Sequence, residues 1–87
     1  MRDLAVRARC RTVVGLFGES LLGTLSSLQL ASTLGANALA SEVTWYLEMT
    51  RQVVAADITI RDGAITLPDT PALAALVDWD AVKRHAV

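Results

Sequence analysis

The stretch VVGLFGESLLGTLSSLQLAS, Val13 to Ser32, decides how this sequence is interpreted. It begins with a short apolar run rich in β-branched residues, which is typical of a buried strand. A single carboxylate, Glu19, follows, and no Asp, Glu, Lys or Arg occurs between Ser20 and Ser41. Three interpretations of Glu19 compete: a charge at a helix terminus, a boundary of a membrane segment, or one catalytic group of a larger site.

The residues on either side of Glu19 predict a strand and then a helix. Thr12 to Phe17 is expected to be a strand covered on both faces, preceded by a short helix over about residues 2–9. After Ser20, a suitable N-cap, leucines recur at helical spacing up to about Leu34. A parallel-type strand needs neighbours, and this region offers none, so the sequence predicts an incomplete sheet.

The composition points in the same direction. Of 87 residues, 53% are hydrophobic and only 20% are charged, and the mean hydropathy is +0.42. A chain of this length buries a smaller share of its surface than a full-sized domain does. It therefore has more apolar surface than it can cover, which predicts a partner, an oligomer or a missing remainder of the same polypeptide.

Several classes of function are disfavoured. The net charge is −1, so no overall field attracts nucleic acid, and the arginines near the start are expected to be a solvated helix face. The uncharged run from Ser20 to Ser41 holds too many Ser, Thr, Asn and Gln residues for a membrane span. One cysteine, Cys10, allows no internal disulfide and is expected to be a small buried apolar residue. With no visible signal peptide, these features predict a cytoplasmic protein.

The second half of the chain carries local signals. In DITIRDGAITLP, the Asp62-Gly63 pair predicts a two-residue hairpin turn in which Ile60 faces Ile65. Ala36 to Gln52 is expected to be irregular with short helix. The final DWDAVKRHAV predicts a short helix capped by Asp78, with basic residues in its last turn.

The residues permit little self-contained chemistry. The only histidine, His85, and the only lysine, Lys83, both fall in the last turn of that terminal helix, where they favour the helix dipole. Metal-ligand motifs, nucleophile–histidine pairs and phosphate-binding glycine loops are absent from the sequence. Glu19 alone lies where a strand passes into a helix, which is the active-site end of a (β/α)-barrel unit.

The order of these features resembles the carboxyl-terminal part of the muconate lactonizing enzyme/mandelate racemase group of the enolase superfamily. VVGLFGESLLGTLSSLQLAS is similar to the last barrel strand of that group, its glutamate and the following helix. ITIRDGAITLPDTPALAALVDWDAVKRH is similar to the closing segment of the group, a hairpin leading to a terminal helix. Within the group, muconate-type cycloisomerases are the most similar.

The resemblance implies an α/β fold, the carboxyl-terminal piece of a (β/α)-barrel whose hairpin and short helix return to an α+β capping domain. Residues 1–52 would end the barrel, and residues 53–87 would form the closing segment. The implied chemistry stabilises an enediolate of a small carboxylate substrate on a divalent metal, Mg or Mn, with Glu19 assisting the substrate carboxylate. The metal ligands and the acid/base lysines belong to earlier strands, so no metal-binding or cofactor-binding residue is assigned here.

The sequence departs from the group where the Pro-Gly-Leu-Gly of the family reads Pro71-Ala72-Leu73-Ala74. If the family glycines adopt positive φ, alanine there changes the path of the chain. The first hypothesis is therefore part of a metal-dependent cycloisomerase or racemase, inactive alone. The alternative is a stand-alone α+β protein that buries its apolar surface in a homo-oligomer. A DNA-binding module is disfavoured by the charge.

Overall fold

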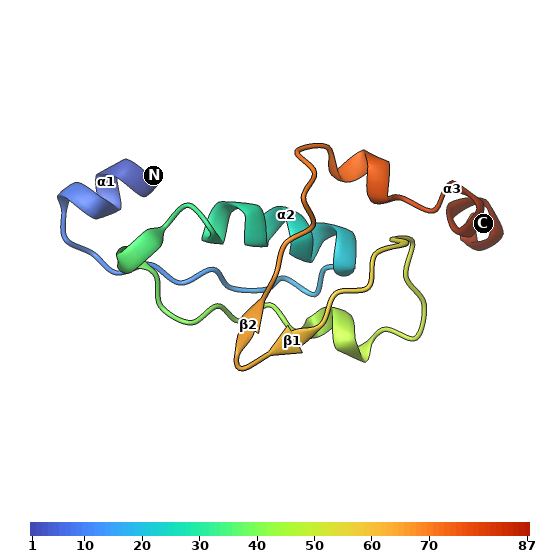
Figure 1. Cartoon of the computed structure of the whole chain (residues 1–87), viewed down its shortest axis with the longest axis horizontal. Coiled ribbons are helices and arrows are strands. Elements are labelled where there is room, and N and C mark those ends of the chain that lie inside the picture. Colours follow the sequence, from blue (N-terminus) through green and yellow to red (C-terminus); the bar gives the residue numbers. More distant parts are fainter.

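A computed structural model describes residues 1–87, and it is elongated, with extents of 46 × 24 × 24 Å. Three α-helices, three short 3₁₀ helices and one two-stranded hairpin follow one another along the chain (Figure 1). In chain order they are α1 (Arg2–Arg7), α2 (Leu21–Ala31), η1 (Gly35–Asn37), η2 (Trp45–Glu48), β1 (Ile60–Arg61), β2 (Ala64–Ile65), η3 (Leu73–Leu76) and α3 (Trp79–His85).

The hydrophobic core is small and lies against α2. Leu25 is fully buried, and it clusters with Leu21, Tyr46 and Val54. Side chains that flank the hairpin and η3 pack against this cluster, so both halves of the chain contribute to it. Only 8 of the 87 residues are buried, which leaves most of the apolar side chains in contact with solvent.

The segment expected to be a strand, 12–17, has a neighbour after all. Thr12 forms a parallel bridge with Ala38, and the peptide groups of Thr12 bond to Asn37 and Leu39. Figure 1 shows this segment running below α2 beside the chain that follows η1. Because the two paired segments are separated by α2, they form a β-α-β arrangement. The prediction that the region offers no pairing partner was wrong.

The prediction that this strand is covered on both faces was also wrong. Thr12 and Val14 are half-buried, whereas Val13 is 52% exposed and Phe17 fully exposed. The alternation has a simple cause: α2 covers one face, and no other element of the chain reaches the opposite face. The ladder is accordingly a single bridge rather than a strand of regular length.

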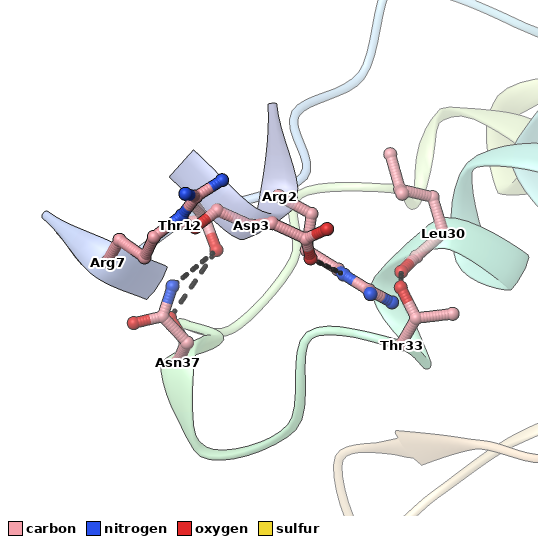
Figure 2. A network of polar contacts seen from close by, with 7 residues as sticks. All are labelled: Arg2, Asp3, Arg7, Thr12, Leu30, Thr33 and Asn37. Atoms are coloured by element: carbon pink, nitrogen blue, oxygen red, sulfur yellow. Dashed lines mark hydrogen bonds and ion pairs between the residues drawn. The ribbon is translucent and has the colours of Figure 1, made fainter. Parts of the chain in front are cut away.

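Asn37 ties the two paired segments together. Its amide nitrogen donates to the carbonyl of Cys10 at 2.8 Å, and it also lies 3.5 Å from the Thr12 hydroxyl. Figure 2 shows Asn37 turned toward Thr12 near the end of α2, where the Thr33 hydroxyl donates to the carbonyl of Leu30. These two contacts join residues that are 27 and 25 positions apart in the sequence, and they fix the register of the two segments.

Helix α2 begins where expected but is capped differently. Ser20 is the N-cap residue, yet its side chain makes no capping bond. Instead, the Leu21 N–H donates to Oε1 of Gln52 at 3.0 Å, and Nε2 of Gln52 donates to the carbonyl of Tyr46 at 3.0 Å. The helix ends at Ala31, earlier than predicted, because hydroxyl side chains just beyond it bond back to its last carbonyls.

The predicted hairpin is confirmed. Ile60 pairs with Ile65 in an antiparallel register, and the two turn residues Asp62 and Gly63 have φ of 50° and 73°. Two successive positive φ values are the mark of the type I′ turn that an Asp-Gly pair favours. Ile58 and Leu67, which lie on either side of the hairpin in the sequence, pack against the core.

The terminal helix is confirmed as well. Asp78 is the N-cap of α3, and its carboxylate accepts bonds from the N–H groups of Asp80 and Ala81 at 3.0 and 2.9 Å. Before this helix, Ala72 has φ of −110°, and Ala74 has no positive φ either. The chain thus takes a path here that alanine adopts without strain.

Candidate functional site

Glu19 lies in the loop that joins the 12–17 segment to α2. Gly18, which precedes it, has φ of +80°, a conformation that glycine adopts without steric cost, and it lies beside the Trp45 indole. The loop turns sharply at this point, so Glu19 follows the carboxyl end of the segment that pairs in parallel with residues 38–42. The structure therefore puts Glu19 between this extended segment and the first turn of α2.

The Glu19 carboxylate is bound by its own loop. Its Oε2 accepts a hydrogen bond from the Phe17 N–H. This bond is the main reason that the pKa of Glu19 lies below its usual value, followed by a bond from its own N–H and a smaller contribution from the Ser27 hydroxyl. The group is ionised at neutral pH in this chain, and it can only accept hydrogen bonds.

Gly23 makes room for the Glu19 side chain. A Cβ built at Gly23 would lie 2.7 Å from the Glu19 Cβ and 3.1 Å from its Cγ. Any larger residue at position 23 would push Glu19 away from the first turn of α2. The glycine in LLGTLSS thus has a specific function, which is to let Glu19 fold back along the start of the helix.

The other titratable groups do not gather around Glu19. Nowhere do three or more His, Cys, Asp or Glu side chains lie close enough together to hold a metal ion. Lys83 pairs loosely with Asp80 at 3.5 Å on the exposed surface of α3, and His85 lies in the last turn of the same helix. These residues do not supply a donor set for the divalent metal that the family resemblance implies, so any such metal would need ligands from another polypeptide segment.

Two further features were not expected from the sequence. Cys10 is exposed, which contradicts its predicted burial, because the segment around it meets no second layer. The Tyr46 hydroxyl is buried and has no hydrogen-bond partner, although its ring belongs to the core cluster. No sequence pattern indicated this buried hydroxyl, since Tyr46 falls in the stretch predicted to be irregular with short helix.

Comparisons of the chain with protein-family models, with curated proteins and with solved structures find no match in any of the three. No helix is long and apolar enough to cross a bilayer, since α2, with 11 residues, is the longest. The candidate site therefore consists of one ionised carboxylate, Glu19, at the end of the extended segment that forms a single parallel bridge through Thr12.

Proposed function

We propose that this chain is the carboxyl-terminal portion of a metal-dependent cycloisomerase or racemase, similar to muconate cycloisomerase, and is inactive by itself. The observation that supports this most directly is the parallel pairing of residues 12–14 with 38–42 across α2, with Glu19 at the carboxyl end of the first segment. Active sites of (β/α)-barrels are built at the carboxyl ends of the strands, so this position of Glu19 supports the proposal.

The unfinished surface of the chain supports the same proposal. A monomer of 9.3 kDa exposes about 5,000 Å² when folded compactly. The chain exposes 6491 Å², roughly 1,500 Å² more than that expectation. Its radius of gyration, 14.5 Å, also exceeds the roughly 12 Å expected for 87 residues. In the complete enzyme, the rest of the barrel and the capping domain would cover this excess.

In this proposal, Glu19 assists the carboxylate of a small substrate while the enediolate forms. An ionised Glu19 would repel that substrate, so it must take up a proton before it can donate a hydrogen bond to it. Covering Glu19 with the rest of the barrel and placing the substrate carboxylate beside it both raise its pKa in the required direction. The divalent metal, Mg or Mn, and the acid/base lysines come from the remainder, and no step is assigned to them here.

The proposed location is the cytoplasm. The chain has a single cysteine, Cys10, so it allows no internal disulfide, which fits a reducing compartment. The net charge of the chain is only −1, and no nucleic acid or membrane partner is part of the proposal.

The test is complementation. The 87-residue chain is mixed with a muconate cycloisomerase barrel truncated before its last strand, in the presence of Mn²⁺, and the conversion of muconate to its lactone is followed. We expect activity from the mixture and none from either part, with Glu19→Ala, which removes the donor, strongly reducing turnover while leaving assembly intact. If the assembled Glu19→Ala variant were as active as the unchanged chain, the assignment of Glu19 would be wrong.

The alternative, a stand-alone homo-oligomeric protein without catalysis, is favoured by two observations. The backbone N–H and C=O groups of Val13 have no hydrogen-bond partner, and an apolar groove lies next to this residue, so both features are compatible with self-association. If the chain forms a stable complex with itself and does not assemble with the truncated barrel, this second function replaces the first.

A further inference from the structure

The outer edge of the 12–17 segment is free. Thr12 and Val14 direct their backbone bonds to the neighbouring 37–42 segment, whereas the N–H and C=O groups of Arg11, Val13 and Gly15 have no hydrogen-bond partner. The side chains alternate in the same way, since residues 11, 13 and 15 are all exposed. A row of unpaired backbone groups is a template for another strand.

We propose that a second copy of this chain pairs with this edge, antiparallel and about a two-fold axis through Val13. Val13 of one copy would face Val13 of the other and exchange two backbone bonds with it, as hydrogen-bonded antiparallel partners do. In the same register, Arg11 lies opposite Gly15 of the second copy at both ends of the pairing. The interface is therefore isologous, with the same residues used by each copy.

This register is self-complementary in shape. Gly15 has no side chain, and a Cβ placed there would meet nothing within 4 Å, so the long Arg11 side chain of the second copy has room opposite it. Val13 faces another β-branched residue, a pairing that sheets favour. The two copies of Arg11 do not face each other directly, because each lies opposite a glycine.

The residues that follow Gly15 in the second copy extend the contact into an apolar groove of the first copy. The groove has a volume of about 710 Å³ and runs between α1, the 12–14 segment and the end of α2. Among its lining residues are Leu4, Ala8, Cys10 and Leu34. In the proposed register, residue 16 of the second copy lies opposite Cys10 and on the same face, which directs the exposed Leu16 toward this groove.

The exposed area matches the size of such an interface. The chain exposes roughly 1,500 Å² more than a compact monomer of its mass. Obligate dimers bury about 1,000–2,500 Å² on each partner, so one two-fold interface can cover most of this excess. The inference does not depend on the proposed function, because it concerns what occupies the edge when no barrel remainder is present.

The first experiment uses the native cysteine. In the proposed register, Cys10 faces residue 16 of the second copy as a non-hydrogen-bonded pair, whose Cα atoms lie about 4.5 Å apart, within the range that a disulfide spans. We expect Leu16→Cys to give a disulfide-linked dimer on mild oxidation, seen on a non-reducing gel. The unchanged chain should not cross-link, because its two Cys10 residues would be about 20 Å apart along the paired strands, six residues at the strand rise.

The matched control for cross-linking is Leu47→Cys. Leu47 is also an exposed leucine, but it lies in η2, away from the proposed interface. Equal cross-linking of Leu16→Cys and Leu47→Cys would show random collision rather than a defined register, and it would overturn the proposal.

The second experiment introduces a charge opposite Arg11. Gly15→Glu puts two carboxylates opposite two arginines, and Gly15→Arg puts like charges together. From the usual worth of cross-strand charge pairs, we expect the dimer dissociation constant to fall about two- to thirtyfold with Glu and to rise by a similar factor with Arg. Sedimentation velocity over a concentration series measures both constants. The same two substitutions at Ala75, an exposed residue of η3, are expected to leave the constant unchanged.

Three results would each overturn the proposal. They are a monomer at all concentrations, open-ended association beyond the dimer, and equal dissociation constants for the Gly15→Glu and Gly15→Arg variants. Equal dissociation constants would mean that the copies associate through another surface. If the dimer forms and dissociates only when the truncated barrel is added, a barrel strand competes for the same edge.

Discussion

Replacing Gly23 by alanine sets a gain in helix stability against a steric conflict with Glu19. Gly23 lies inside α2, where alanine is preferred over glycine by about 0.8–1.0 kcal/mol. The added Cβ would lie only 2.7 Å from the Glu19 Cβ, closer than such atoms approach in real structures. Since that atom is fixed to the backbone, a rotamer change cannot relieve the contact, and the loop around Glu19 must shift.

The consequence is measurable in two quantities. In the unchanged background, we expect Gly23→Ala to give none of the usual gain in the free energy of unfolding, or a loss. In a Glu19→Gly background, which removes the opposing Cβ, the same substitution should stabilise by about 0.8–1.0 kcal/mol. The shift of the loop also breaks the bond from the Phe17 N–H, so the pKa of Glu19 should rise toward its usual value.

Urea unfolding followed by circular dichroism, at one protein concentration, measures the first quantity. Carbon-detected NMR titration of the Glu19 carboxyl measures the second. Ser26→Ala, at an exposed position of the same helix, reports an alanine effect without the steric conflict. The reasoning is refuted if Gly23→Ala stabilises equally in both backgrounds and leaves the Glu19 titration unchanged.

Three further outcomes are expected. Leu25→Ala, which empties the one fully buried leucine position, should lower the free energy of unfolding by about 2–5 kcal/mol in urea melts and leave little folded protein, because few other residues are buried. Gly63→Ala, at φ of 73°, should lower the free energy of unfolding by about 1–2 kcal/mol in the same assay. Thr66→Ala, at an exposed position just after β2, should lower it by less. The pKa values of Glu19 and Asp78 are both lowered in the folded chain. The contribution of these two carboxylates to the free energy of unfolding is therefore complete above their pKa values in the unfolded chain, near 4, and it is lost as the pH falls through their pKa values in the folded chain. Glu19→Gln removes one of the two contributions, so it should make the fall in stability with decreasing pH shallower.

The elements that could be predicted from the sequence are those whose causes are local. The hairpin follows from two adjacent residues, Asp62 and Gly63, that accept positive φ, and its register follows from the turn. Helix α3 follows from Asp78, whose carboxylate accepts bonds from N–H groups two and three residues ahead. Each of these contacts is contained in a few consecutive residues, so the pattern carries the whole explanation.

Contacts between residues far apart in the chain could not be predicted from the sequence pattern. The bridge between Thr12 and Ala38 depends on how α2 folds back, and Ala36 to Gln52 carries no strand signal that would identify a partner. The position of Glu19 between the extended segment and α2 was predicted, but its bond to the Phe17 N–H and its dependence on Gly23 were not. The burial expected of Cys10 failed for a related reason, since burial depends on a layer that these residues do not form.

The Gln52 amide has a consequence for the order in which the chain can fold during synthesis. It is the protein partner of the Leu21 N–H at the start of α2, although it lies 31 residues later in the sequence. While the ribosome is still adding those residues, the first turn of α2 has only water to bond with and is free to fray. Helix α2 therefore reaches its final state only after Gln52 has emerged, and a pause in translation before that point would prolong the exposure of its leucines.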